Sequence, residues 1–390
     1  MYVNVAILKE TQPHERRVAL VPSVALKLIK LGAKLHMQSG AGDAIELTDR
    51  AFKDVAFIDD RHALVSDADV VLAVQPPALD VVSAMKEGAI LISFVYANKE
   101  PALVQPLLDG KITCFAMERV PRITRAQSMD ALSSQSALAG YYAVQLGATH
   151  LARILPKITT AAGAIGPAKV LVMGLGVAGL EAIATAHRLG AIVEGYDVRP
   201  ETQEQALSLG AKFVETGVDA RGKGGYAREL TAEEKSKVTA VLTRHVQQAD
   251  LVITTAAIPG RPSPKLISKT QVAGMKAGAV IVDLSAEGGG NCEDTQPGET
   301  TQVGQVTIVA PLNVPSLLGE DASELYAKNQ YNLLALMMKD NVIKLDWDDE
   351  ILAGTVLTHD GQRMDKAAAH GAKPGGGIKK AARTPAAKAA

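Results

Sequence analysis

The chain has 390 residues, 47% of them hydrophobic and only 4% aromatic, and its formal net charge is −1. This composition fits a globular protein with two sizeable cores and excludes a disordered or fibrous chain. The near-neutral charge gives no reason to expect a nucleic-acid partner. Two cysteines, Cys114 and Cys292, cannot form a disulfide framework, so a reducing cytoplasm is the expected setting.

The N-terminus runs directly into an apolar strand, without a basic region or a cleavage site, so we expect no export signal. Two windows lack Asp, Glu, Lys and Arg, at 131–152 and 300–319. The first contains several polar residues and the second contains two prolines, so we expect no membrane span in either.

Short apolar runs alternate with helical patterns through the N-terminal third of the chain, which predicts βαβ units and a parallel sheet. Strands are expected at Val3–Leu8, Lys34–Gln38, Asp69–Val74, Ala89–Phe94 and Lys111–Phe115, with a helix at Pro22–Leu31. Residues from Ala126 to Leu155 are typical of a loop followed by a helix.

A second series of βαβ units begins after Pro156. Its six expected strands are Lys169–Met173, Ala191–Tyr196, Lys212–Val214, Leu251–Thr255, Ala279–Leu284 and Val306–Ala310. Six such strands predict a doubly wound sheet. The amphipathic segment Ala322–Lys339 does not continue this pattern, and we expect it to be a helix that packs back on the first domain.

The fold class predicted from these patterns is α/β with two Rossmann-like domains. We expect a flavodoxin-like N-terminal domain of residues 1–134 plus 322–365, completed by a C-terminal helix, and a doubly wound parallel domain of residues 135–321. Beyond Asp365 the chain is rich in Gly, Ala and Pro, and six basic residues face no acid. We therefore expect residues 366–390 to be a disordered basic tail, which is either simply solvated or a tether to an anionic membrane surface or a partner.

A glycine motif lies at the start of the second series. Gly174, Gly176 and Gly179 follow an apolar strand and open a helix at Val177. In such a motif the first glycine makes the turn, the second lets the pyrophosphate approach the backbone, and the third lets the helix pack on the strand. The alternative is a glycine-rich turn that binds nothing.

An acid follows the glycine motif at the spacing expected of a nucleotide site. Asp197 ends the next strand, 18 residues after Gly179, where its carboxylate would bind ribose hydroxyls and repel a 2′-phosphate. The motif therefore predicts an NAD(H) site that includes Val198 and Arg199, although the charge of Arg199 weakens the discrimination against NADP(H).

Two further segments have polar or flexible compositions. The segment from Glu118 to Ser136 carries Arg, Gln, Asp and Ser side chains at the expected domain junction, where they could hold a carboxamide and a ribose. A solvated hinge with a helix cap is the alternative. The segment from Thr216 to Arg228 is long and glycine-rich, which indicates either a mobile flap or an insertion without a role.

Together these segments give the chain, over about residues 1–360, a resemblance to the alanine dehydrogenase/transhydrogenase family. Within this family it looks like the NAD(H)-binding component of proton-translocating transhydrogenases, in the form where that component is a separate alpha subunit. The resemblance rests on the Glu10–Pro22 segment, the Arg122–Ser136 loop, the glycine motif with Tyr196–Arg199, the Gly224–Ala227 flap and the Ile281–Cys292 segment.

The resemblance implies that Arg122, Gln127, Asp130 and Ser133 surround the nicotinamide. Gly225 and Tyr226 would close over the nucleotide, and Arg125 and Ala257 would contribute to its binding. It further implies a homodimer and Si-specific, proton-translocating hydride transfer. NADP(H) would come from a partner subunit, and a membrane-spanning subunit would hold the chain peripherally on the inner face of the membrane. No metal is implied.

Alanine dehydrogenase is the alternative activity within the same architecture. Amino-acid oxidation needs an acid/base group beside the hydride acceptor and a cation for the substrate carboxylate. Alanine dehydrogenases have a lysine where this chain has Gln75, and a histidine where it has the Ser93–Tyr96 stretch. Arg17 is retained, and Glu287 stands where that family has an aspartate, but neither replaces both missing groups. A third hypothesis is a non-catalytic NAD sensor or scaffold.

Overall fold

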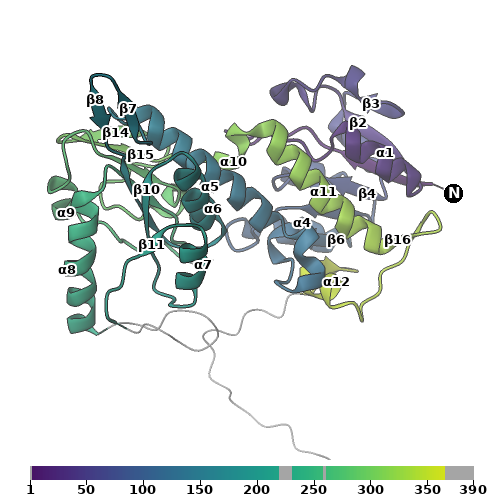
Figure 1. The fold of residues 1–390 in the computed structure, drawn as a ribbon. Helices are drawn as coiled ribbons and strands as arrows, with labels where there is room; N and C mark the ends of the chain where they lie inside the picture. The colour runs from purple at the N-terminus through teal and green to yellow at the C-terminus, as the bar shows by residue number, and fades with distance from the viewer. Residues whose placement is uncertain (1, 219–230, 258–260, 365–390) are drawn as a thin grey trace, which may run out of the picture.

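The computed structural model describes residues 2–218, 231–257 and 261–364, which form two α/β domains side by side (Figure 1). Each domain is built on its own largely parallel sheet, and each sheet has a buried core on both faces. This arrangement confirms the predicted α/β class with two Rossmann-like domains.

The first sheet has six parallel strands in the order β3-β2-β1-β4-β5-β6, extended beyond β6 by the antiparallel strands β18 and β19. The parallel strands are β1 (Val3–Ile7), β2 (Ala33–Gln38), β3 (Val55–Ile58), β4 (Val70–Leu72), β5 (Ile90–Ser93) and β6 (Thr113–Ala116). The added strands are β18 (Val356–His359) and β19 (Gln362–Arg363). The helices of this domain's N-terminal segment are α1 (Pro22–Lys30), α2 (Arg61–Ser66), α3 (Leu79–Ser83) and α4 (Val104–Asp109).

This strand order corrects the predicted flavodoxin-like arrangement. Numbered along the chain, the parallel strands run 3-2-1-4-5-6, which is the order of dinucleotide-binding folds. Strand β3 was not predicted, because it is a four-residue edge strand without a buried position. Without β3 the remaining strands would read 2-1-3-4-5, the flavodoxin order. Both domains therefore share one topology.

The second sheet has the order β11-β10-β9-β12-β13-β15-β14, in which only β14 is antiparallel. Its strands are β9 (Lys169–Met173), β10 (Ile192–Tyr196), β11 (Lys212–Phe213), β12 (Leu251–Thr254), β13 (Val280–Asp283), β14 (Thr300–Val303) and β15 (Val306–Val309). The helices are α6 (Val177–Arg188), α7 (Thr202–Ser208), α8 (Ala232–Gln248) and α9 (Lys269–Ala273). All six predicted strands are present, and β14 is the one that the sequence analysis missed.

Strand β9 shows why an unbroken apolar run lies at the centre of this sheet. Its side chains alternate between the two faces, so Val170 and Val172 enter one core while Leu171 and Met173 enter the other. All four are at most 1% exposed. The strand ends at Met173, directly before Gly174, and the glycine motif consequently lies at the carboxyl edge of the sheet.

Two long helices connect the domains. Helix α5 (Ala131–His150) begins at the first domain and packs along α6 of the second, as Figure 1 shows. Helix α11 (Gly319–Met337) returns to the first domain, where Tyr326, Leu333 and Leu334 are completely buried in its core. This confirms the predicted return of the C-terminal helix. Because α5 is continuous between the sheets, the domain limits 1–134 plus 322–365 and 135–321 stay a proposal.

The chain beyond β15 contributes four more short elements around α11. Helix α10 (Val314–Leu317) precedes α11, and the hairpin of β16 (Met338–Lys339) and β17 (Val342–Ile343) follows it. Helix α12 (Glu350–Thr355) then leads directly into β18. The first domain is thus completed by a helical and a β segment, not by a helix alone.

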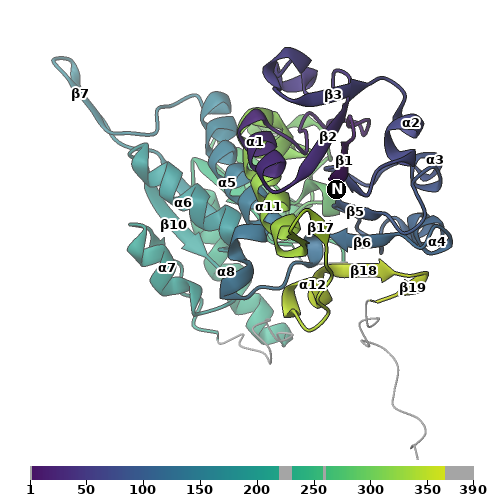
Figure 2. The same cartoon turned by 90° about the vertical axis from the view of Figure 1, so that its right-hand side faces the viewer.

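A β-hairpin projects from the second domain. Strands β7 (Ile158–Thr160) and β8 (Gly163–Ile165) pair with each other, and every residue in them is exposed. Figure 2 shows β7 extending away from the body of the protein. A lone two-stranded hairpin is at best marginally stable in water, so this arm is a candidate for contact with another chain.

Candidate dinucleotide site

The three glycines of the motif differ in whether the fold leaves room for a Cβ at their position. Gly174 has φ of +96°, and a Cβ there would lie 2.8 Å from Thr255 Oγ1. A Cβ on Gly179 would collide with the carbonyl oxygen of Gly174. A Cβ on Gly176 would instead meet no heavy atom within 4 Å. The fold therefore requires Gly174 and Gly179, whereas nothing within the described residues requires a glycine at 176.

The first turn of α6 is a suitable site for an anion. Gly176 is the N-cap of α6 and provides no side-chain cap, and the first turn contains no acidic residue. The backbone N–H groups of this turn consequently lack intrahelical acceptors at the positive end of the helix dipole. An open Gly176 beside these donors fits the pyrophosphate of a dinucleotide.

Asp197 lies at the carboxyl end of β10 beside this loop. Its Oδ2 accepts a hydrogen bond from the Leu175 amide at 2.7 Å, which holds the glycine loop in place. The Arg199 guanidinium donates to both carboxylate oxygens, at 3.0 and 2.9 Å, and this hydrogen bond to Asp197 raises the pKa of Arg199. A ribose diol that binds Asp197 must therefore share or displace Arg199. Val198 is exposed beside the pair.

The polar segment at the domain junction forms the start of α5. Asp130 is the N-cap of this helix and accepts hydrogen bonds from the Ser133 amide at 2.9 Å and the Ser133 hydroxyl at 2.6 Å. Arg122 and Gln127 are exposed, and their side chains have no hydrogen-bond partner among the described residues. We call Arg122, Gln127, Asp130 and Ser133 the clamp residues.

The structure gives Arg125 a different place from the other residues of this segment. Its Nη1 and Nη2 donate to Asp349 Oδ2 and Oδ1 at 2.8 and 2.7 Å, so its guanidinium pairs with the chain just before α12. We therefore do not retain Arg125 among the proposed nucleotide contacts.

Helix α5 connects the clamp residues to the glycine motif. Gly140 packs so closely on the first turn of α6 that a Cβ there would collide with the Ala178 carbonyl. Ser133 and Gly140 are seven residues apart, which is about 10 Å along a helix. A nicotinamide riboside attached to the pyrophosphate spans a comparable length. One continuous helix thus sets the clamp residues about 10 Å from the first turn of α6.

The loops after β12 and β13 complete the carboxyl edge. The buried Asp283 accepts hydrogen bonds from the Asn291 amide and the Thr295 hydroxyl, at 2.7 and 2.6 Å. Asn291 in turn bonds both the N–H and the carbonyl of Ala256, at 3.0 and 2.8 Å. This network fixes the backbone beside Ala257, which is exposed at the site.

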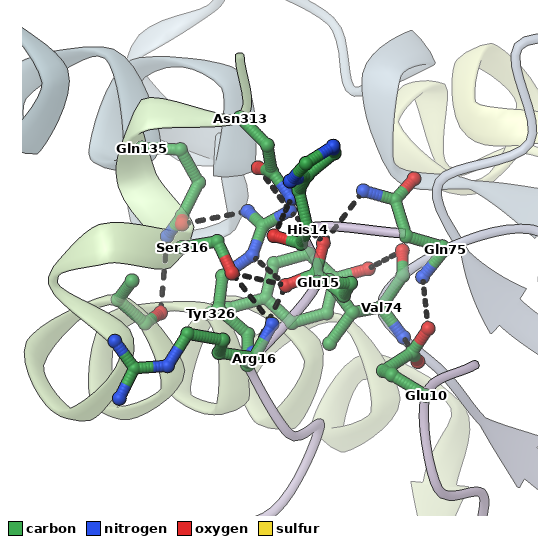
Figure 3. Close-up of polar contacts among 12 residues, drawn as sticks. Glu10, His14, Glu15, Arg16, Val74, Gln75, Gln135, Asn313, Ser316 and Tyr326 are labelled. Atoms are coloured by element: carbon green, nitrogen blue, oxygen red, sulfur yellow. Dashed lines mark hydrogen bonds and ion pairs between the residues drawn. The ribbon is translucent and has the colours of Figure 1, made fainter. Parts of the chain in front are cut away.

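A buried ion pair lies at the junction of the two domains (Figure 3). Arg17 donates to both oxygens of Glu15, at 2.8 and 2.6 Å, and the two side chains are 4% and 0% exposed. Gln75, Asn313 and Ser316 donate to the same carboxylate at 2.7, 3.0 and 3.1 Å. Burial alone would raise the pKa of Glu15, but the hydrogen bond and charge of Arg17 lower it to about 2. The pair is therefore ionised and has no net charge.

This ion pair ties together segments that are distant in the sequence. Arg17 also donates to Gln135 of α5 at 2.9 Å, and Gln135 donates to the Ala322 carbonyl of α11 at 3.1 Å. The backbone N–H of Asn313 donates a hydrogen bond to the Glu287 carboxylate at 2.9 Å. Sequence reasoning had singled out Arg17, Gln75 and Glu287, but it missed Glu15, the acceptor that Arg17 and Gln75 share. The i, i+2 spacing of Glu15 and Arg17, directly before the apolar run Val18–Val21, was the available signal.

A second carboxyl group of this region, Glu10, is also buried. It accepts hydrogen bonds from the Val74 and Gln75 amides at 2.6 and 3.3 Å, at the carboxyl end of β4. Burial raises the pKa of Glu10 to about 8, against the opposing effect of these amides. Glu10 is therefore largely protonated at neutral pH, which the sequence analysis did not predict.

Several predicted features lie outside the described residues. These are the flap residues Gly225 and Tyr226 and the basic tail 366–390. Within residues 2–218, 231–257 and 261–364, no helix has both the length and the apolar character that crossing a bilayer requires. The same residues contain no group of three or more His, Cys, Asp or Glu side chains placed to bind a metal ion.

The fold and the site together define a two-domain α/β protein with a dinucleotide-type site on its second domain. The chain belongs to the alanine dehydrogenase/PNT family: the N-terminal domain of that family matches residues 6–139, and its C-terminal domain matches residues 143–366. This confirms the family resemblance drawn from the sequence.

Three relatives place the chain within this family. It is 40% identical to "NAD(P) transhydrogenase subunit alpha" of Haemophilus influenzae, over 93% of this chain and 72% of that one. A transhydrogenase structure from Sinorhizobium meliloti is 40% identical, with a TM-score of 0.81, over 92% of this chain and 98% of that one. An alanine dehydrogenase from Mycolicibacterium smegmatis is 28% identical, over 94% and 95%. Alanine dehydrogenase is thus the more distant relative.

Proposed function

We propose that this chain is the NAD(H)-binding component of a transhydrogenase. The observation that carries the proposal is the connection by α5, which sets the clamp residues about 10 Å from the anion site at α6. In the proposed complex the pyrophosphate lies on the first turn of α6, and Asp197 accepts hydrogen bonds from the adenosine ribose. The nicotinamide end lies against the clamp, with Ala257 beside it and Gly225 and Tyr226 closing over it.

Bound NADH would supply a hydride from its nicotinamide C4. The residues of this chain act by binding, orientation and exclusion of water, because transfer between two nicotinamide rings needs no proton acceptor. The exposed Arg122 and Gln127 are available to bind the carboxamide and the adjacent ribose or phosphate. Asp130 and Ser133 are hydrogen-bonded to each other at the start of α5, the helix that also packs on α6. Their hydrogen-bonding groups are therefore fixed in position.

The chemistry of the junction argues against the alternative, oxidation of a small amino acid. That reaction needs a group that accepts a proton near neutral pH. Gln75 offers an amide that donates to Glu15 at 2.7 Å, and burial raises the pKa of Tyr96 well above its usual range. Arg17, the retained cation, is paired with Glu15 and 4% exposed. Glu10 has a pKa of about 8, but it is buried and its two oxygens accept hydrogen bonds from the Val74 and Gln75 backbone amides. These contacts favour hydride transfer without proton exchange at this site.

The proposed reaction needs partners. Within the described residues we find one dinucleotide motif, so NADP(H) would be held by another subunit of the complex. The transhydrogenase relative carries the name of an alpha subunit, which supports a multi-subunit assembly. We propose that a membrane-spanning subunit couples the Si-specific transfer to proton movement and keeps this chain on the cytoplasmic face of the membrane. The projecting β7–β8 arm, with Ile158 and Ile165 41% and 54% exposed, supports a homodimer in which the arm contacts a second copy.

The test is an assay of hydride transfer from NADH to an NADP⁺ analogue. It is run with the purified chain alone and with an NADP(H)-binding subunit of a transhydrogenase added. Transfer that needs both proteins supports the proposal. Oxidation of NADH by the chain alone, dependent on ammonium and pyruvate, would overturn it in favour of an amino-acid dehydrogenase. NADH binding without transfer under either condition would favour a sensor.

A further inference from the structure

One clamp residue, Gln127, lies in a short 3₁₀ helix, η5 (Thr124–Met129), and a second, Asp130, directly follows it. In such a helix side chains three residues apart lie on the same face, and the hydrogen bonds have poorer geometry than those of an α-helix. A 3₁₀ helix of six residues therefore needs contacts with its surroundings to hold one orientation. The three faces of η5 can be assigned separately.

The first face of η5 is buried in the core of the first domain. It consists of Ala126 and Met129, which are 0% and 5% exposed. The third face consists of Thr124, Gln127 and the following Asp130, of which Thr124 and Gln127 are exposed. Gln127 and Asp130 are both clamp residues, so this is the face that the nucleotide would contact.

The second face, Arg125 and Ser128, is held by the C-terminal segment of the chain. Arg125 makes its two hydrogen bonds with Asp349, which is 224 positions later and is itself the N-cap of α12. The carbonyl of Ser128 accepts from the Nδ2 groups of both Asn329 and Asn332 on α11, each at 2.9 Å. Two elements of the returning chain thus hold η5, one through the Arg125 side chain and the other through the backbone carbonyl of Ser128 near its C-terminal end.

We propose that Asp349, with Arg125, and Asn332 are positioning residues for hydride transfer. They touch neither nucleotide, and they fix the rotation of η5 so that Gln127 and Asp130 face the nicotinamide. This inference rests on the proposed function. Because the glycine motif and Asp197 belong to the other domain, loss of these contacts leaves the binding of the adenosine and pyrophosphate moieties intact. The effect falls on the rate of transfer, since small misplacements of aligning groups are costly there.

The test uses Asp349→Asn, which keeps an N-cap side chain for α12 but removes the charge that pairs with Arg125. Arg125→Ala, the double variant and Asn332→Ala complete the set. The matched control is Glu87→Gln, which breaks an exposed ion pair with Lys111 in the same domain, 2.6 Å long in the native protein. Each variant is assayed for hydride transfer with the NADP(H)-binding partner subunit, for equilibrium binding of NADH, and for amide hydrogen exchange in residues 124–130.

We expect Asp349→Asn and Arg125→Ala each to slow transfer about tenfold, with the dissociation constant of NADH changed less than about twofold. The double variant should be no slower than either single one, because both break the same contact. Hydrogen exchange in residues 124–130 should rise in these variants and not in Glu87→Gln.

Outcomes that defeat the inference are distinct from failure of the proposed function. A native chain that transfers no hydride with its partner refutes the proposed function itself. If the native chain is active, an unchanged rate in Asp349→Asn, or equal losses of rate and NADH affinity, would overturn the positioning role. So would unchanged hydrogen exchange in residues 124–130.

Discussion

Gly176→Ala is the substitution that most directly tests where the dinucleotide binds. Gly176 has φ of −78° and ψ of −166°, a backbone conformation that alanine adopts readily, and its new Cβ would meet no atom of the protein within 4 Å. The methyl group would instead occupy the space over the first turn of α6, where the pyrophosphate is proposed to approach. We therefore expect a folded protein that has lost nucleotide affinity.

The size of the loss follows from the contacts that the methyl group prevents. Two hydrogen bonds from first-turn amides to a charged phosphate are worth about 1.5 kcal/mol each. Their loss, about 3 kcal/mol, weakens NADH binding about 100-fold. The thermal unfolding midpoint should change by no more than about 2 °C, because no packing contact is disturbed.

The assay is equilibrium titration with NADH together with thermal unfolding, and the chain offers two comparison variants. Gly166→Ala adds a methyl group at another exposed glycine with no atom within 4 Å, and neither property should change. Gly179→Ala places its Cβ against the Gly174 carbonyl, so both stability and binding should fall. Unchanged NADH affinity in a folded Gly176→Ala variant would refute the assignment of the pyrophosphate to α6.

Three further predictions concern other regions of the molecule. Asp197→Ala should weaken NADH binding and, by releasing Arg199, strengthen NADPH binding; titrations that show equal losses for both nucleotides would contradict this role. The folded state holds the Glu10 proton more tightly than the unfolded state, because burial raises its pKa from 4.5 to about 8. The stability that Glu10 contributes is thus complete below pH 4.5 and lost as the pH rises through 8, by up to about 5 kcal/mol. Glu10→Gln should remove the fall in denaturant-derived stability between pH 4.5 and about 8, whereas the exposed control Glu100→Gln should not. A Glu10→Gln variant that keeps the native pH profile would exclude this origin. Finally, Ile158→Ser with Ile165→Ser should convert the proposed homodimer to a monomer in light scattering, and a dimer that persists would show that the arm does not hold it.

Much of the second domain was predictable because its signals are local. The apolar run 169–173, the three glycines and Asp197 specify strand, turn, helix and strand within about 30 residues, and the structure contains each of them. The return of the C-terminal helix was also predictable, since its apolar face needed a surface to cover. Among the strands of the two main sheets, β3, β14 and β19 were missed because they are two to four residues long and contain no buried position, so burial imposes little apolar pattern on them. Strand β18 is buried at three of its four positions, but it is too short for a periodic pattern to identify it.

The candidate site, like the fold, was only partly predictable from the sequence. Its residue types and approximate place came from the composition of the 118–136 segment, and the NAD(H) contacts from the spacing of the glycine motif. The partners of those residues came only from the tertiary structure: Arg17 meets Asn313 296 positions later, and Arg125 meets Asp349 after 224. Local sequence determines backbone conformation and which face is apolar, because these depend on neighbouring residues. Which charged side chains finally meet depends on how the whole chain returns on itself, and no periodicity along the sequence encodes that.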